Sequence, residues 1–298
     1  MLSSGSFTNS PIRQNYPPLV CIPTTAGTGS EAGKSSVISD LNGVKSVIGH
    51  PSFMPLFVAL DPQLTTSMPP QLTASTATDA LFHCFEALMV TQKDAYEDGC
   101  DDSAIQDCDH YAVEGIKLIL RHLPLVMKEP NNLQSRLALL VAGSLGAKAF
   151  RKGSLGAVHS TAHSLSFASH LHHGTAIARM SFPVTHYNET LLHSRTKDEE
   201  TQSSLSKFGL LYDTFHSYGG FSASSPSDRH KLSQVIKQFI ESCGLKVGVK
   251  DLLPSSSSER NKLLEDLAQV SFKDACQTNL VRLSLEDYRN IFKLAAEF

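Results

Sequence analysis

The change in sequence pattern at Pro69-Pro70 limits the possible fold more than any other feature of this chain. Residues 18–66 contain short apolar runs separated by turn residues, which is typical of strands. After Pro70 the apolar residues recur at spacings of three and four, which predicts helices. We therefore expect a small α/β part, residues 1–66, followed by an all-helical domain, residues 67–298.

The expected elements follow from this change of pattern. Apolar runs at 18–23 and 56–60 are candidates for buried strands, and the segments 35–39 and 45–49 flank a turn at 40–43, as in a hairpin. Helical spacing predicts helices at about 71–90, 110–128, 132–150, 157–168, 203–215, 228–243, 258–271 and 284–297. Exposed loops are predicted at 94–109 and 255–258.

Composition and charge exclude several classes of protein. Apolar residues make up 41% of the chain and charged residues 18%, as in ordinary globular proteins. The net charge of -3 argues against nucleic-acid binding and a polybasic membrane patch, and the apolar runs are too short to cross a bilayer. The six cysteines form no C-x-x-C pair, and the N-terminus lacks the pattern of a secretory signal. We therefore expect reduced thiols in a cytoplasmic protein.

Histidine is unevenly distributed, because five of the 13 histidines fall within 15 residues. They are His159, His163, His170, His172 and His173. His159 and His163 are four residues apart in an apolar segment, so both side chains would lie on one face of a helix. A short connection after this helix could bring His173 back beside His159.

Asp79 and His83 form a second pair with the same spacing, in a strongly apolar helical segment. A carboxylate and an imidazole one turn apart can bind the same cation, and an ordinary helical ion pair is the alternative. Buried ionisable groups need partners or a metal, so the apolar surroundings favour the cation. One aspartate with three histidines would suit a first-row divalent ion, whereas a set of hydrogen-bonded core histidines is the competing interpretation.

The small-residue segment Pro23–Glu31 is a third candidate. Its glycines allow close approach of the backbone to a ligand, and its hydroxyls and N–H groups can hold phosphate or ribose, although a plain turn is the alternative. Lys45 could pair with a phosphate or be an ordinary surface lysine. Cys100 and Cys108 could bind metal with nearby aspartates, but a solvated acidic loop is favoured.

Together, and in this order, these segments resemble the iron-containing alcohol dehydrogenase family. The family pattern P-T-T-x-G-T-G-S-E is matched by Pro23–Glu31, and D-A-x-x-H-x-x-E-A is matched by residues 79–87. The pattern G-x-x-H-x-x-A-H-x-L is matched by residues 156–165, and a final H-G by His173-Gly174. The match extends from about residue 18 to the C-terminus, and four separated motifs make it specific.

The resemblance implies roles for individual residues. The implied metal ligands are Asp79, His83, His159 and His173, with His172 as a competitor for the last position. His163 is the implied catalytic residue beside the nicotinamide and substrate. The implied cofactor-contacting residues are Thr24, Thr25, Thr28, Ser30 and Lys45. The implied cofactors are Fe²⁺, with Zn²⁺ acceptable to the same ligands, and NAD or NADP; a homodimer or other homo-oligomer is the expected assembly.

The resemblance also implies a dehydroquinate synthase-like architecture, in which an incomplete Rossmann-like sheet precedes the all-α metal-binding domain. Full-length members carry a Gly-Gly-Gly-Ser pyrophosphate loop upstream, and no such loop precedes residue 23 here. We therefore expect an N-terminally truncated member with a partial dinucleotide-binding domain, residues 1–66, that binds NAD(P)H poorly by itself.

The implied activity is reversible hydride transfer between a small alcohol and NAD(P)⁺, giving an aldehyde or ketone. Related family chemistry, such as lactaldehyde, glycerol or hydroxyacid–oxoacid conversion, is one alternative. A truncated pseudo-enzyme that binds metal but little cofactor is another.

Overall fold

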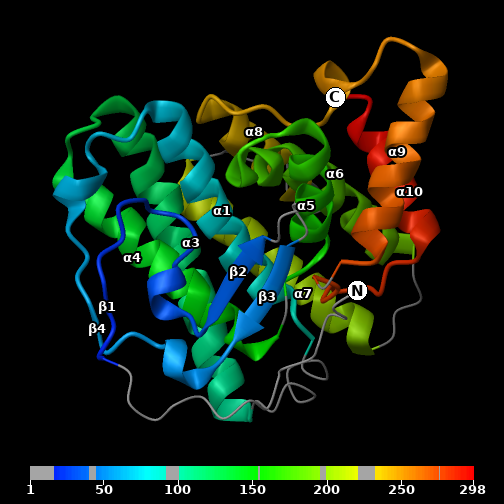
Figure 1. Cartoon of the computed structure of the whole chain (residues 1–298). Coiled ribbons are helices and arrows are strands. Elements are labelled where there is room, and N and C mark those ends of the chain that lie inside the picture. The colour runs from blue at the N-terminus through cyan, green and yellow to red at the C-terminus, as the bar shows by residue number, and fades with distance from the viewer. Residues whose placement is uncertain are drawn as a thin grey trace.

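The computed structural model describes residues 17–39, 45–91, 101–153, 155–194, 199–220, 232–274 and 276–298. In these residues a helical body follows two small N-terminal sheets (Figure 1). The helices are α1 Pro70–Met89, α3 Asp102–Lys128, α4 Leu133–Ala149, α5 Ala157–Ser169, α6 His173–Ser194, α7 Glu199–Gly219, α8 Leu232–Ser242, α9 Ser257–Phe272 and α10 Leu285–Ala295. The predicted fold class, an α/β remnant followed by an all-α part, is confirmed.

The N-terminal strands form two separate pairs. Strand β1, Val20–Cys21, pairs in parallel with β4, Phe57–Val58. Strand β2, Ser35–Ser39, pairs antiparallel with β3, Lys45–Gly49, which confirms the predicted hairpin. Its predicted turn, 40–43, lies outside the described residues.

The apolar strands β1 and β4 are exposed, so the prediction that they are buried was wrong. The side chains of Leu56 and Phe57 are 64% and 66% exposed, and Val20 is 54% exposed. These strands pair only with each other, and no other part of the described chain covers their apolar residues. Apolar sequence alone indicates a preference for burial but cannot supply the neighbour that would bury it.

Helix α1 runs through the centre of the helical body, between α3, α4, α5 and α6 (Figure 1). It begins at Pro70, as a proline in the first turn allows. From Thr73 to Met89 every residue is buried, because small and apolar side chains occur all round the helix. The ligand candidates Asp79 and His83 therefore lie inside the protein.

Helix α3 begins eight residues earlier than the predicted helix at 110–128, so residues 102–109 are not the exposed loop that was expected. The side chain of Asp101 accepts a hydrogen bond from Ala104 N at 2.8 Å and caps the helix. Asp102 lies in the first turn, where a negative charge suits the helix dipole. Acidic residues here start a helix.

Helix α6 was not predicted from the sequence. It contains Pro183, which lacks an N–H and would normally interrupt a helix. The carbonyl of Arg179, one turn earlier, instead accepts a hydrogen bond from Gly248 N at 2.7 Å. A distant loop thus satisfies the carbonyl that the proline leaves unpaired.

Among the helices of the described segments, none combines the length and the apolar character that a membrane span requires.

Candidate metal centre

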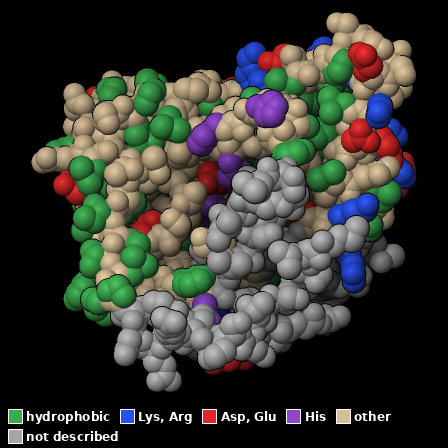
Figure 2. Space-filling model, viewed as in Figure 1, with side chains coloured by type: hydrophobic (Ala, Val, Ile, Leu, Met, Phe, Trp, Pro, Cys, Tyr) green, Lys and Arg blue, Asp and Glu red, His purple; other side chains and the backbone are tan. Residues whose placement is uncertain are grey.

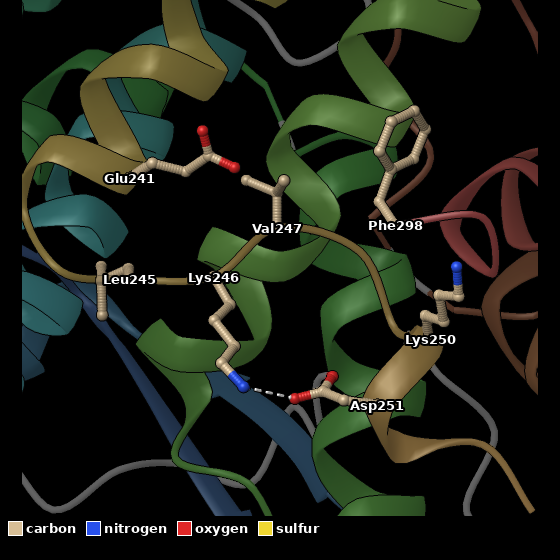
Figure 3. A pocket seen from close by; sticks show the side chains of 7 residues that line it. All are labelled: Glu241, Leu245, Lys246, Val247, Lys250, Asp251 and Phe298. Carbon is tan, nitrogen blue, oxygen red and sulfur yellow. Dashed lines mark hydrogen bonds and ion pairs between the residues drawn. The ribbon is translucent and has the colours of Figure 1, made fainter.

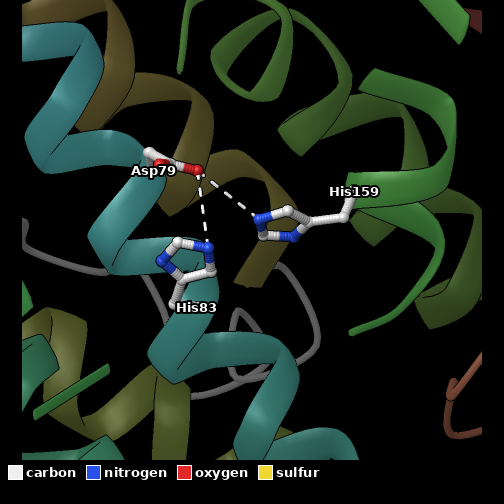
Figure 4. Close-up of side chains that lie close together, drawn as sticks. All are labelled: Asp79, His83 and His159. Carbon is white, nitrogen blue, oxygen red and sulfur yellow. Dashed lines mark ion pairs between the residues drawn. The ribbon is translucent and has the colours of Figure 1, made fainter. Parts of the chain in front are cut away.

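Three histidine side chains lie close to one carboxylate oxygen, Oδ1 of Asp79 on α1. This atom lies 3.7 Å from Nε2 of His83, 3.4 Å from Nε2 of His159 and 3.3 Å from Nε2 of His173. His83 also lies on α1, His159 lies on α5, and His173 is the first residue of α6. Figure 4 shows Oδ1 of Asp79 facing two of the rings, and Figure 2 shows histidine side chains gathered in the middle of one face.

Close packing of α6 against α1 brings His173 to this position. A Cβ atom added at Gly174 would lie 2.2 Å from the backbone oxygen of Ser75, so only glycine permits this approach. The adjacent His172 has its Nδ1 3.5 Å from Oγ of Ser75. Of the two neighbouring histidines, the structure places His173 beside Asp79.

The separations in this cluster suit atoms that share an ion. Ligand atoms at about 2.1 Å from one tetrahedral ion stand about 3.4 Å apart, which is close to the three distances from Asp79. Oδ1 of Asp79 and Nε2 of His159 are buried and have no hydrogen-bond partner among the described residues. Such orphaned atoms destabilise a fold by about 1–3 kcal/mol each, and a cation between them removes the penalty. The residues therefore fit a divalent metal ion.

Burial and mutual contact set the protonation of the ligands. Burial lowers the pKa of His83 to about 3, so near neutral pH its imidazole is in the uncharged form that binds metal. Burial raises the pKa of Asp79, but the adjacent histidines outweigh it and hold that pKa well below its usual value. Burial lowers the pKa of His159, but Glu86 and Asp79 outweigh it and raise that pKa to about 9.

Glu86 supports His159, a role that sequence reasoning did not assign. Its Oε2 lies 2.5 Å from Nδ1 of His159 and accepts a hydrogen bond from Gly156 N at 3.0 Å. Its Oε1 accepts from Val158 N at 2.7 Å. The carboxylate thereby directs Nε2 of His159 toward Asp79 and increases its basicity as a ligand. Glu86 stands seven residues after Asp79, so helical periodicity placed both on one face of α1 and could have revealed it.

His163, the candidate catalytic residue, lies at the edge of the cluster. Its ring stacks on that of His173 with centroids 5.2 Å apart, and its side chain is 30% exposed. Nδ1 lies 3.0 Å from Oδ2 of Asp274, which follows α9. A carboxylate at Nδ1 favours the tautomer with its proton there and leaves Nε2 as the acceptor. Asp274 is 111 residues away in sequence, and no local pattern indicated it.

The loop at 23–31 lies against α1 and α4. Its predicted cofactor-contacting side chains are all exposed: Thr24, Thr25, Thr28 and Ser30. Gly29 has a φ of 63°, and a Cβ added there would lie 2.1 Å from the backbone oxygen of Gly143 on α4. Ser144 donates a hydrogen bond to Glu31 at 2.5 Å and fixes the end of the loop. The glycines pack on the helices, whereas the threonines and Ser30 are exposed, and the hydroxyl of Thr28 accepts a hydrogen bond from Ser30 N at 3.3 Å.

The remaining candidate residues are Lys45, Cys100 and Cys108. The side chain of Lys45, at the start of β3, lies outside the described residues, as does Cys100. Cys108 is buried in α3, with Sγ 3.5 Å from the backbone oxygen of Lys148. The surface pocket in Figure 3, whose rim carries the Lys246–Asp251 ion pair, contains none of the candidate ligands.

Known proteins resemble both parts of the chain. The model of the "Fe-containing alcohol dehydrogenase family, C-terminal" matches residues 73–296, and that of "Iron-containing alcohol dehydrogenase" matches residues 3–62. The probable alcohol dehydrogenase EutG of Escherichia coli (strain K12) is 35% identical over 179 residues, which are 60% of this chain and 42% of that protein. The match thus spans less than half the length of this relative.

Solved structures share the fold. A 1,3-propanediol oxidoreductase superposes with a TM-score of 0.77 at 27% identity, covering 95% of this chain and 67% of that one. A sulfoacetaldehyde reductase from Bifidobacterium kashiwanohense, solved in complex with NAD⁺, superposes with a TM-score of 0.74 at 24% identity, covering 97% and 68%. The chain belongs to the iron-containing alcohol dehydrogenase family.

Proposed function

We propose that this chain binds one divalent metal ion and takes part in reversible hydride transfer between a small alcohol and NAD(P)⁺. The observation that supports this most directly is the buried Asp79 carboxylate with three imidazole nitrogens at 3.3–3.7 Å. One oxygen and three nitrogen donors suit Fe²⁺, and Zn²⁺ is accepted by the same donor types. The family match supports alcohol dehydrogenase chemistry, and the structural relative solved in complex with NAD⁺ supports a nicotinamide cofactor.

The four proposed ligands differ in their exposure to solvent. Asp79, His83 and His159 are buried, whereas the side chain of His173 is 27% exposed, so the substrate would approach past His173. A bound ion would supply Lewis-acid chemistry at the substrate oxygen, and a bound nicotinamide would supply the hydride acceptor. The role of Glu86 is to hold the His159 ring in the orientation that presents Nε2.

We assign proton transfer to His163. Asp274 accepts a hydrogen bond from its Nδ1, so Nε2 is free to take the hydroxyl proton of the substrate. The partly exposed ring can then pass this proton to solvent. His163 in this assignment does not bind the metal.

The exposed hydroxyl groups of the loop at 23–31 are proposed to contact the dinucleotide. Thr24, Thr25, Thr28 and Ser30 are exposed on a loop whose glycines pack on α1 and α4, so the backbone that carries these side chains is held in place. Lys45 remains a predicted contact. A division at residues 66/67, a homo-oligomer and a cytoplasmic location also remain predictions.

Turnover by the metal-loaded chain tests the proposal. We would reconstitute the protein with Fe²⁺ and follow NADH and NADPH oxidation with short aldehydes, including lactaldehyde. Because the chain is expected to bind NAD(P)H poorly, we expect slow aldehyde-dependent oxidation at high nucleotide concentration. Asp79→Asn should abolish it, while Glu114→Gln, at the surface ion pair with Lys117, should retain it. Equal rates in the wild type and Asp79→Asn would contradict the proposal, and so would the absence of turnover in a chain that binds both metal and nucleotide.

A further inference from the structure

A second group of metal-ligating side chains lies at Nδ1 of His163, the ring nitrogen to which the proposed function gives no contact with substrate. It consists of His163 on α5 with Asp274 and Cys276, which follow α9. One donor atom from each residue lies within 4.8 Å of the other two, and all three residues are partly buried. Nδ1 of His163 and Oδ2 of Asp274 are 3.0 Å apart. None of the three belongs to the proposed ligand set around Asp79.

The backbone around these donors is held in place. Oδ1 of Asp274 accepts a hydrogen bond from Cys276 N at 2.8 Å. Gln277 Nε2 donates to the backbone oxygen of Asp274 at 2.9 Å. The hydroxyls of Ser164 and Ser271 lie 2.8 Å apart and connect α5 to α9. A cation entering here would therefore meet donors whose main chain is already positioned.

The chemistry of the donors selects the kind of ion. An imidazole nitrogen, a carboxylate oxygen and a thiolate sulfur are ligands of Zn²⁺, at about 2.0–2.3 Å. Donors around such an ion stand about 3–4 Å apart, and the three donor atoms here lie within 4.8 Å of one another. Mg²⁺ and Ca²⁺ prefer oxygen, so they would not compete well. Partial exposure leaves room for water as the fourth ligand.

We propose that His163, Asp274 and Cys276 form a second site that binds a thiophilic divalent ion such as Zn²⁺. Binding forms bonds from the ion to Nδ1, the carboxylate and the sulfur. The thiol proton of Cys276 goes to solvent, and the proton on Nδ1 of His163 is replaced by one on Nε2. No group is oxidised or reduced. The alternative state is a metal-free cluster in which Asp274 simply orients His163.

Occupation of this site has a consequence that rests on the proposed function. With Nδ1 bound to the ion, the neutral ring carries its proton on Nε2 and can no longer accept one from the substrate. The second ion would therefore inhibit turnover while the first site remains filled. Fe²⁺, bound by nitrogen and oxygen donors around Asp79, and Zn²⁺, bound here through sulfur, would have opposite effects.

Cobalt binding tests the site without reference to activity. Co²⁺ would be titrated into the metal-free chain of 298 residues, with ions per chain and the near-ultraviolet thiolate-to-cobalt band as the two readouts. We expect two ions and a thiolate band in the wild type, and one ion without the band in Cys276→Ala and in Cys276→Ser. Asp79→Ala should lose the first ion but keep the band. Cys21→Ala, which alters another partly exposed cysteine, should behave as the wild type.

Two results would overturn the site: a single ion with no thiolate band in the wild type, or a thiolate band that persists in both Cys276 variants. Inhibition by Zn²⁺ is then compared between the wild type and Cys276→Ser. Zn²⁺ can displace Fe²⁺ from the first site in both proteins, so only their difference reports the second site. If the second ion binds but inhibits both proteins equally, the site stands and the assignment of proton transfer to His163 is wrong.

Discussion

Replacing Glu86 by glutamine should weaken both the fold and the metal site. Glu86 is 4% exposed. Its carboxylate oxygens lie 2.5–3.0 Å from three nitrogen atoms: the backbone N of Gly156, the backbone N of Val158 and Nδ1 of His159. Glutamine offers only one acceptor oxygen. If that oxygen replaces Oε2, the amide group faces the N–H of Val158, and two donors meet at an interior position.

The magnitude follows from these contacts. One buried donor without a partner costs about 1–3 kcal/mol, and each of the two retained hydrogen bonds loses about 1 kcal/mol with the charge. We therefore expect the free energy of unfolding of the metal-free protein to fall by about 3–5 kcal/mol. Metal affinity should fall about 10–100-fold, because the variant no longer holds His159 as a carboxylate does.

Urea unfolding of metal-free protein and chelator competition for the metal would measure the two effects. Glu114→Gln is the matched control, because Glu114 pairs with Lys117 at 2.7 Å on the surface and its side chain is 39% exposed. That variant should change stability by no more than about 0.5 kcal/mol and leave metal affinity unchanged. Unchanged metal affinity and stability in Glu86→Gln would refute the role given to this carboxylate.

Three further predictions concern His163, Gly29 and Asp251. His163→Ala should keep the Fe²⁺ at Asp79 but slow turnover by about 10²–10⁴-fold, and loss of this iron on elemental analysis would show that His163 is a ligand of the first site. Gly29→Ala should destabilise the protein by about 1–3 kcal/mol and weaken NADH binding in calorimetry, because the new Cβ would clash with the backbone oxygen of Gly143. The control Gly209→Ala has open space around its Cβ, so its effect on stability should be neutral or favourable. Hydrogen bonds from Arg179 hold the pKa of Asp251 far below its ordinary value of 3.8, so Asp251→Asn should lower the free energy of unfolding at neutral pH. In urea unfolding, the difference between wild type and variant should shrink as the pH falls below 3.8, because protonation of Asp251 removes the carboxylate contribution. A difference that does not change with pH would contradict the assignment.

Local sequence patterns predicted the parts of the site that depend on one helix. The spacing of four residues placed Asp79 with His83 and His159 with His163, because helix geometry alone fixes which side chains share a face. The position of His173 depends instead on the approach of α6 to α1 at Gly174. Its spacing from His163 only suggested this, and the family resemblance supplied the rest.

Long-range contacts explain what the sequence did not reveal. Helix α6 contains Pro183, and only the hydrogen bond from distant Gly248 to Arg179 shows why the helix continues there. Asp274 reaches His163 across 111 residues, so no periodic pattern connects them. Phe57 on β4 was predicted to be buried from its apolar character, but it is exposed, because the sequence does not show which residues pack beside it.

Anomalous X-ray diffraction at the iron absorption edge, from crystals of the Fe²⁺-loaded protein, tests the central claim most directly. We expect one strong peak at bonding distance from Oδ1 of Asp79 and from Nε2 of three histidines, His83, His159 and His173. His163 should lie beyond bonding distance from that peak. A protein that retains no iron, or a peak whose ligands do not include Asp79 and His159, would contradict the account.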